Sequence, residues 1–365
     1  MFRLFSKKQE EIRKENRDLL SVCEEAVGKG SARSAADLIL SEYRVGTLPF
    51  FEAWDLAKEL PYCHDLDELQ ARFGVTEPPE EHVKTLDCFS AVYGAVYGDI
   101  IGSFYEGDLV ESVQEALQDP SADYYHPTDD TILTLATLQV VMNREAVLLE
   151  NRAREKTDFG KTQTYPIRQN PYTSAYRVFA DKYPVAGFGS GFVSWHCSGG
   201  DKPYGSFGNG SAMRISPIGA LYHTQEDVIL QAAVSAMATH NHIEGVKGAI
   251  VTAMCIYLAR HGYSKKQIRS YLIKHYSYGE PLWEKFRYRE AVKLRSHPFE
   301  CLFSVPAAVL SFVESTDFAD AINKAACVGY DTDTNACICG GIAGAYYGIS
   351  REVREVVKEK LAFLG

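Results

Sequence analysis

The chain has 365 residues, of which 38 are Lys or Arg and 48 are Asp or Glu, so its formal net charge is −10. This acidic balance argues against nucleic-acid binding through phosphate neutralisation, which needs clustered basic residues. A hydrophobic fraction of 46%, no run of about 18 apolar residues and no N-terminal signal core predict a soluble globular protein without a membrane partner. Nine cysteines without a C-x-x-C pair indicate reduced thiols and a cytoplasmic location.

Residues 1 to about 80 are rich in charge and have helical periodicity, with ten charged side chains in the first twenty positions. Helices are expected within residues 1–27, from residue 34, near 50–60 and over 65–73. The segment 76–80, TEPPE, is the clearest linker signal. We therefore expect a helical N-terminal extension, residues 1–80, followed by a larger domain, residues 81–365.

From residue 82 onward, long apolar stretches alternate with glycine-rich turns, and the alternation typical of strands is scarce. Helices are predicted over 86–107, 131–142, 226–240, 246–262 and 353–364. The segment 187–210 contains eight glycines and is predicted to be mostly loop. The sequence therefore predicts an all-α fold.

One predicted helix carries both glycines and acids. Gly94, Gly98 and Gly102 recur on one face, where they allow a neighbouring backbone to approach closely. Asp99 and Glu106 are seven residues apart, which places them two turns apart on the same helix. Glu106 is near the expected helix end, where a carboxylate opposes the helix dipole unless a cation or substrate lies close.

Two acidic clusters each precede a helical run: TDDT at 128–131 and DTDT at 331–334. Either could simply cap its helix, since Ser, Thr and Asp are favoured there. However, capping needs one oxygen, and two such clusters offer four carboxylates and neighbouring hydroxyls. An all-oxygen set of this kind suits Mg²⁺ or Mn²⁺, and two ions are feasible if the fold brings the clusters together.

Two further segments have polar groups suited to a ligand. The stretch 205–211, GSFGNGS, has neither dinucleotide-binding nor Walker spacing, but its backbone N–H groups could bind an anion. The stretch 239–242, THNH, contains an H-x-H pair without a third metal-ligand partner nearby. Hydrogen bonding is therefore favoured over metal ligation for these histidines.

Together, the segments 94–107, 126–131, 205–219 with 239–242, and 329–348 resemble the ADP-ribosylglycohydrolase family. This family includes the ADP-ribosyl-acceptor hydrolases and the dinitrogenase reductase-activating glycohydrolase. The resemblance implies a compact all-α domain with a binuclear magnesium site. It covers about residues 85 to 349 and leaves the first 80 outside.

The resemblance also implies roles for individual residues. The metal ligands would be Thr128, Asp129, Asp130, Asp331, Asp333 and Thr334. The catalytic residues would be Glu106 and Asp331. The ligand-binding residues would be Asp99, Gly205, Ser206, Phe207, Gly208, Asn209 and His240, with adenine stacking on Phe207 or Phe188.

The implied activity is magnesium-dependent hydrolysis of the bond that links ADP-ribose to a protein, with arginine as the leading acceptor. Serine-linked or small-molecule ADP-ribose is an alternative, and the acidic clusters alone would also suit a magnesium phosphohydrolase. The layout resembles bacterial immunity proteins that bind type VI secreted ADP-ribosyltransferase toxins through an extension. Residues 1–80 are therefore expected either to bind a toxin, with a mainly toxin-binding protein as the alternative function, or to pack against the domain or another subunit.

Overall fold

The computed structural model describes residues 88–109, 111–154, 170–200, 202–276, 298–362 and 364. The chain divides into two units, Met1–Glu77 and Pro78–Gly365, and every described residue belongs to the second. The helices expected in residues 1–80 and the boundary expected near residue 80 lie outside the described residues, so they stay predictions.

The described part of the chain is helical, which confirms the all-α prediction. Its helices are α5 (Ser90–Ser103), α6 (Gln114–Gln118), α7 (Asp129–Arg154), α8 (Pro171–Lys182), α9 (Ser190–Cys197), α10 (Gly210–Met213), α11 (Ser216–Leu221), α12 (Gln225–Ala236), α13 (Ile243–Arg260), α14 (Lys265–His275), α17 (Cys301–Glu314), α18 (Phe318–Ala326), α19 (Thr332–Tyr347) and α20 (Arg351–Ala362). Strand pairing among these residues is limited to one isolated bridge between Gly208 and Glu300.

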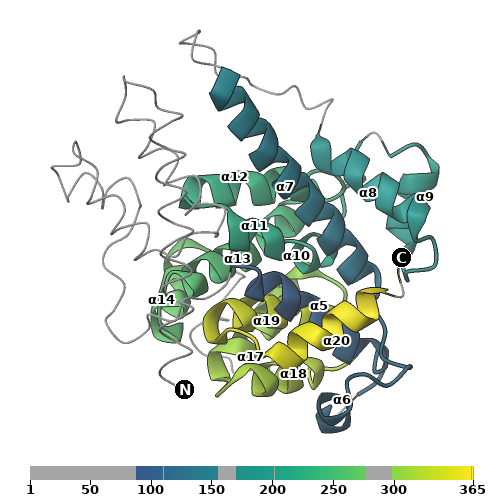
Figure 1. Ribbon diagram of the computed structural model, residues 1–365, viewed down its shortest axis with the longest axis vertical. Helices are drawn as coiled ribbons and strands as arrows, with labels where there is room; N and C mark the ends of the chain where they lie inside the picture. Colours follow the sequence, from purple (N-terminus) through teal and green to yellow (C-terminus); the bar gives the residue numbers. More distant parts are fainter. Residues whose placement is uncertain are drawn as a thin grey trace, which may run out of the picture. The chain divides into compact units, whose positions relative to one another are not determined.

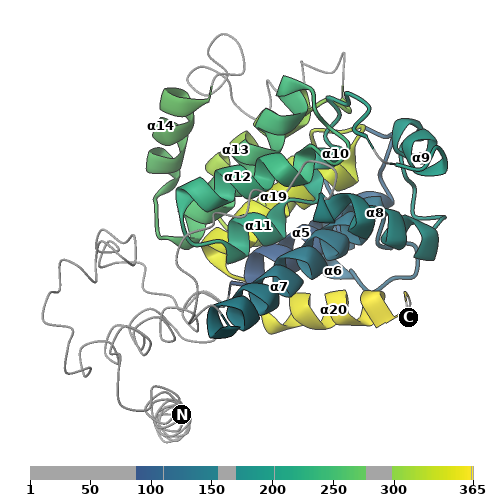
Figure 2. The same ribbon diagram turned by 90° about the horizontal axis from the view of Figure 1, so that it is seen from above.

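The centre of the bundle is the contact between α5 and α19, which the views in Figures 1 and 2 both place in the interior. A Cβ added at Gly94 would lie 2.3 Å from the Gly340 carbonyl oxygen, and one at Gly98 would lie 2.1 Å from that of Ala336. Added at Gly102, it would lie 2.5 Å from the Cα of Asp333. The expected glycine face is therefore a direct backbone contact, and it ends beside the second acidic cluster.

Other helices cover this central pair. α13, α17 and α18 pack against α19, α12 packs on α13, and α20 crosses the outer side of α5 (Figure 1). The hydrophobic core runs through these contacts. α7 and α10 also contact α19.

One predicted helix ends earlier in the structure, and one segment predicted to be mostly loop includes a short helix. α5 ends at Ser103, where the Ser103 hydroxyl donates to the Ile100 carbonyl oxygen at 2.9 Å, and Glu106 lies in the following turn. Asp99 and Glu106 therefore do not share one helix face. The glycine-rich segment 187–210 also contains α9, because Phe192 and Trp195 are spaced to bury on one side of a helical turn.

Within the described residues, no helix is both long and apolar enough to cross a bilayer. The described cysteines are free thiols, as the sequence predicts: Cys88, Cys197, Cys255, Cys301, Cys327, Cys337 and Cys339.

Candidate functional site

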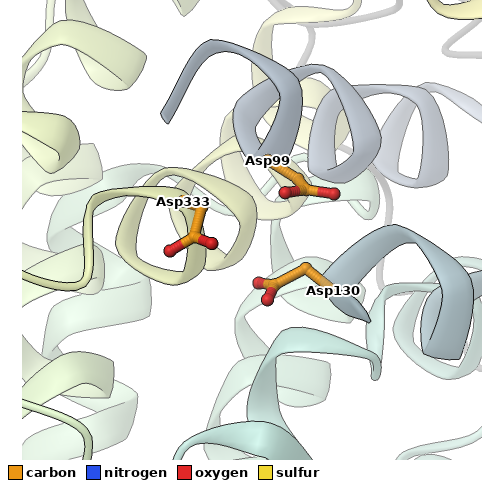
Figure 3. A group of neighbouring side chains, drawn as sticks. All are labelled: Asp99, Asp130 and Asp333. Atoms are coloured by element: carbon orange, nitrogen blue, oxygen red, sulfur yellow. The ribbon is translucent and has the colours of Figure 1, made fainter. Parts of the chain in front are cut away.

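Carboxylate side chains from three helices converge beside the central contact. Asp99 lies on α5, Asp130 in the first turn of α7 and Asp333 in the first turn of α19. One oxygen of each lies within 4.8 Å of the others, and Figure 3 shows the side chains around a common space. Glu106, Asp331 and the same Asp333 form a second trio with this spacing. The two acidic clusters of the sequence therefore meet, and Asp333 belongs to both trios.

Asp99 is bound to the N-terminus of α7. Its carboxylate accepts hydrogen bonds from the backbone N–H groups of Thr128 (2.9 Å) and Thr131 (3.0 Å), and from both threonine hydroxyls. Three of these bonds reach Oδ2 and one reaches Oδ1, and the backbone pair satisfies N–H groups that a helix start leaves open. Asp99 thus caps α7 from another helix and holds its first turn against α5.

The buried carboxylate of Asp130 accepts fewer hydrogen bonds than that of Asp99. Its Oδ2 accepts a hydrogen bond from the Thr334 hydroxyl at 3.2 Å, whereas its buried Oδ1 has no partner among the described residues. Burial and nearby charges, Asp333 foremost, raise the pKa of the Asp130 carboxyl well above its ordinary value. A buried carboxylate oxygen without a donor, surrounded by other carboxylates, suits a hard divalent cation. These oxygen groups therefore fit Mg²⁺ or Mn²⁺.

Asp331 stands directly before α19, but its side chain makes no capping hydrogen bond. Its carboxylate instead accepts a hydrogen bond from the Asn209 side-chain amide, which also donates to the Ser304 hydroxyl at 2.9 Å. The preceding Tyr330 has a φ of 60°, an uncommon conformation for a residue with a side chain. Helix capping therefore does not explain the position of the Asp331 carboxylate. Its hydrogen bond with Asn209 holds it beside the carboxylate cluster.

The turn that carries Glu106 is tied to the segment that carries Asp331. The Gly107 N–H donates to the Tyr330 carbonyl oxygen at 2.6 Å, and the Tyr330 N–H donates to the Asp108 carbonyl oxygen at 2.8 Å. Gly107 has a φ of 88°, which glycine adopts without strain. This pair of backbone bonds holds the two catalytic candidates close together.

Glu106 is the carboxylate at the solvent edge of the cluster. Burial and the charge of Asp333 raise the pKa of its carboxyl, whereas nearby His126 lowers it. A carboxyl with a raised pKa, placed where a substrate can reach it, is suited to exchange a proton during a reaction.

The remaining predicted metal ligands lie around the trios. Asp129 starts α7 but belongs to neither trio, and its Oδ1 lies 3.8 Å from the position of a Cβ added at Gly187. Burial raises the pKa of the Asp129 carboxyl, with the charge of Asp333 next in importance. The hydroxyls of Thr128 and Thr334 donate to Asp99 and Asp130. Metal ligation by these three residues stays a prediction.

The predicted ligand loop is anchored to the start of α17. The Asn209 N–H donates to the Phe299 carbonyl oxygen at 3.0 Å, and the Cys301 N–H donates to the Phe207 carbonyl oxygen at 3.1 Å. Asn209 therefore belongs to both parts of the site, because its backbone holds the loop while its side chain donates to Asp331.

The other loop residues form a tight turn. Gly205 has a φ of 75°, and the Ser206 hydroxyl oxygen accepts a hydrogen bond from the Gly208 N–H at 3.2 Å. A side chain at position 208 would be crowded, since a Cβ added at Gly208 would lie 3.3 Å from Ser206 Oγ. Contact with a ligand stays a prediction for this loop.

The two aromatic candidates for adenine stacking differ in exposure. Phe207 is 46% exposed, and its ring meets the edge of His242 with centroids 5.3 Å apart. Phe188 is half-buried and stacks on Phe192 at 4.9 Å. Phe207 thus offers more free ring surface, and the choice between them stays a prediction.

The histidines of THNH have separate structural partners. His240 is buried, with Nδ1 2.7 Å from the Thr239 hydroxyl oxygen. His242 precedes α13 and accepts the Glu244 N–H at 3.2 Å. Neither joins a cluster of possible metal ligands in the described part of the chain.

Sequence reasoning missed residues that position the acids. Thr131 belongs to the TDDT cluster and binds Asp99 twice, so its position in that cluster was the available signal. Ser304 accepts from the amide that donates to Asp331, and nothing in the local sequence indicates this distant contact.

The structure thus combines a helical fold with two carboxylate trios and a glycine-rich loop. Comparison with known protein families identifies the class of protein to which this arrangement belongs. The model of the ADP-ribosylglycohydrolase family matches residues 87–363. The chain therefore belongs to the ADP-ribosylglycohydrolase family, as its four motifs imply.

Relatives and a solved structure agree with this assignment. ADP-ribosylhydrolase ARH3 of Homo sapiens is 28% identical over 331 residues, which cover 71% of this chain and 84% of that protein. The protein named putative ADP-ribosyl glycohydrolase L543, of Acanthamoeba polyphaga mimivirus, is 23% identical over 313 residues. The matched region covers 71% of this chain and 86% of that protein. A solved ADP-ribosylglycohydrolase-related protein complex shares the fold, with a TM-score of 0.51, 18% identity and coverage of 76% of this chain and 96% of that one. Family and relatives support ADP-ribosyl hydrolase activity in general.

Proposed function

We propose that this protein releases ADP-ribose from a modified protein by hydrolysing the glycosidic bond to an arginine side chain, with Mg²⁺ as cofactor. The observation that carries the proposal is the pair of carboxylate trios that share Asp333. Family membership supplies the general reaction, and the trios supply the acidic groups for a metal-dependent version of it.

Two cations fit the two trios. Asp130 and Asp333 would hold one ion, with Asp99 behind them, and Asp331, Asp333 and Glu106 would surround the other. Bound there, Mg²⁺ or Mn²⁺ would offset the carboxylate charges and polarise substrate oxygen atoms.

Hydrolysis breaks the bond between the anomeric carbon of the ribose and the acceptor nitrogen. Water supplies oxygen to the carbon, and the acceptor gains a proton. Glu106 can hold and pass on that proton, because its pKa is raised and it lies at the solvent edge of the cluster. The Asp331 carboxylate, oriented by Asn209, can accept a hydrogen bond from the water or from a ribose hydroxyl.

The surroundings of Glu106 support an arginine acceptor. Phe104 and Tyr124 are 54% and 51% exposed, and their ring centroids are 4.9 Å apart. Phe104 precedes Glu106 by two residues, and both are exposed. A guanidinium group pairs favourably with both.

The acceptor can be tested with two substrates, one protein modified on arginine and one modified on serine. We expect faster release of ADP-ribose from the arginine-linked substrate, measured by chromatography. Faster release from the serine-linked substrate would reassign the acceptor. Phosphate release from simple phosphoesters, with ADP-ribose released from neither protein, would contradict the proposed reaction.

The metal assignment can be tested by combining Asp331→Ala with Asp333→Ala. This change should reduce ADP-ribose release on the order of 100-fold or more, and EDTA should do the same to the unaltered protein until Mg²⁺ is restored. Glu355→Ala is the control, since Glu355 is an exposed acid on α20 paired with Lys358. Full activity in the double variant would exclude these carboxylates as metal ligands.

We infer a second role for residues 1–80, which is binding of an ADP-ribosyltransferase toxin. The family match begins at residue 87, so this stretch is additional to the shared domain. Capture of a toxin encoded by a neighbouring gene, compared before and after deletion of residues 1–80, tests the role. Equal capture by both forms would contradict it, as would capture by neither.

A further inference from the structure

Three buried polar residues form a chain beneath the ligand loop. Arg214 and Thr239 are 0% exposed and His240 is 3% exposed. The Arg214 Nη2 group donates to the Thr239 hydroxyl oxygen at 2.8 Å, and the same oxygen lies 2.7 Å from His240 Nδ1. Thr239 therefore joins a buried cation to the imidazole beside the loop.

Arg214 is held firmly in this position. Its guanidinium carbon lies 4.1 Å from the ring centroid of Tyr176, and Nη2 also donates to the Ser235 carbonyl oxygen at 3.2 Å. Within the described residues, no carboxylate forms an ion pair with Arg214, and its Nε and Nη1 have no hydrogen-bond partner. A buried guanidinium with so few partners is costly, which favours a role beyond packing.

The directions of the hydrogen bonds follow from the chemistry of each group. Arginine can only donate, so the Thr239 oxygen accepts. The buried Thr239 hydroxyl then needs an acceptor for its own hydrogen, and in the described structure His240 Nδ1 is the partner that can serve. Nδ1 is therefore an acceptor without a proton. Burial and the charge of Arg214 lower the pKa of His240 well below its ordinary value, so the ring is neutral and its single proton is on Nε2.

His240 Nε2 faces the ligand loop. It lies 3.4 Å from the position of a Cβ added at Gly210 and 3.8 Å from one added at Gly208. His240 has no further side-chain hydrogen bond with the residues described, so the Nε2–H group remains available as a donor. Glycines at these two positions leave the space through which a ligand oxygen can approach it.

We propose that Arg214 and Thr239 are positioning residues that hold His240 as an Nε2–H donor to an oxygen of bound ADP-ribose. This inference rests on the proposed function for the identity of the ligand. The hydrogen-bond chain itself can be measured without ligand or turnover.

The first experiment determines the tautomer of His240 in the unaltered protein by long-range ¹H–¹⁵N NMR, with His240→Gln to assign its signals. We expect a proton on Nε2 and none on Nδ1. A proton on Nδ1, or an even mixture of tautomers, would overturn the proposal. This result does not depend on whether ADP-ribose is the ligand, and the tautomer is read from the unaltered protein.

The second experiment measures ADP-ribose binding by calorimetry in three variants. Thr239→Val removes the hydroxyl and should weaken binding about tenfold, the effect of losing one hydrogen bond. Thr239→Ser keeps the hydroxyl and should restore the affinity to within about twofold. Thr252→Val is the matched control, because Thr252 is buried on α13 and its hydroxyl has no partner in the part of the chain that is described.

The outcomes separate the two proposals. The positioning role is supported if the unaltered protein has the Nε2–H tautomer and if Thr239→Val both disturbs that tautomer and weakens ADP-ribose binding. Unchanged affinity in a folded Thr239→Val variant would overturn it. If the unaltered protein binds no ADP-ribose, the proposed function and the ligand named here both fail, while the tautomer result still decides whether the chain sets the ring.

Discussion

Asp99 and Asp130 lie in one carboxylate trio, but their hydrogen bonds give them different tasks. Asp99 accepts four hydrogen bonds from Thr128 and Thr131. Asp130 accepts one from Thr334 and keeps a buried oxygen without a donor among the described residues. The first carboxylate therefore organises the start of α7, and the second is better placed to bind a cation.

Replacing Asp99 with Asn should destabilise the protein. The amide presents an NH₂ group to donors that need an acceptor, and bonds to a charged acceptor contribute about 1.5–3 kcal/mol each. We expect the free energy of unfolding to fall by about 2–4 kcal/mol, measured by urea denaturation in EDTA. An unchanged midpoint would show that the four hydrogen bonds do not hold α7.

Asp130→Asn should have the opposite effect on the cation-free protein. It removes a charge that Asp333 and Asp99 repel, so the melting temperature in EDTA should stay the same or rise by a few degrees. The further rise on adding Mg²⁺ should be lost, because a ligand charge is gone. Retention of that rise, measured by calorimetry, would exclude Asp130 as a metal ligand.

At the scale of elements, the site depends on how closely α5 approaches α19. Glycines at four-residue spacing predicted a close backbone neighbour, and the structure shows that the neighbour is the helix of the second acidic cluster. The spacing alone could not identify that partner, because glycine permits close contact with any backbone.

Gly98→Ala should force these helices apart. The new Cβ would lie 2.1 Å from the Ala336 carbonyl oxygen, and backbone cannot rotate away as a flexible side chain can. We expect a loss of about 1–3 kcal/mol or more in the free energy of unfolding, together with a weaker response to Mg²⁺. Gly189→Ala is the control, since no atom lies within 4 Å of its added Cβ. Equal stability of the two variants would contradict the close contact.

At the scale of the whole molecule, the clustered acids affect stability. In the cation-free protein, burial and neighbouring charges raise the pKa values of Asp130, Asp331 and Asp333. Above about pH 4 the native protein therefore holds more protons than the unfolded chain. The contribution of these acids to stability consequently falls as the pH rises toward their raised pKa values.

Mg²⁺ should restore the stability that the clustered acids lose as the pH rises. The effect should be stronger at higher pH, because protons compete with the cation for the same oxygens. We expect the rise in melting temperature on adding Mg²⁺ to be larger at pH 8 than at pH 5.5. The comparison needs NaCl at matched ionic strength and the Asp331→Ala/Asp333→Ala variant as controls. A rise independent of pH, or one that NaCl reproduces, would argue against binding at the carboxylates.

The sequence predicted local features better than distant contacts. Apolar periodicity and glycine spacing predicted helices and the tight face of α5, since both patterns are local. The end of α5 was placed too late, because the turn through Glu106 depends on bonds to Tyr330 far along the chain. Arg214 was not recognised, although an arginine within the apolar run AMRISPIG was a signal, because its partners lie on other segments.

The backbone contact between α5 and α19 also bears on the thermodynamics of ligand capture. Main-chain atoms, which have no rotamers, set the separation between Asp99 and Asp333. The entropy lost in gathering these carboxylates is therefore lost during folding, and little rearrangement remains when a cation arrives. The proposed metal centre would therefore be preorganised, so charge and dehydration, more than ordering of the protein, would govern how tightly a cation binds.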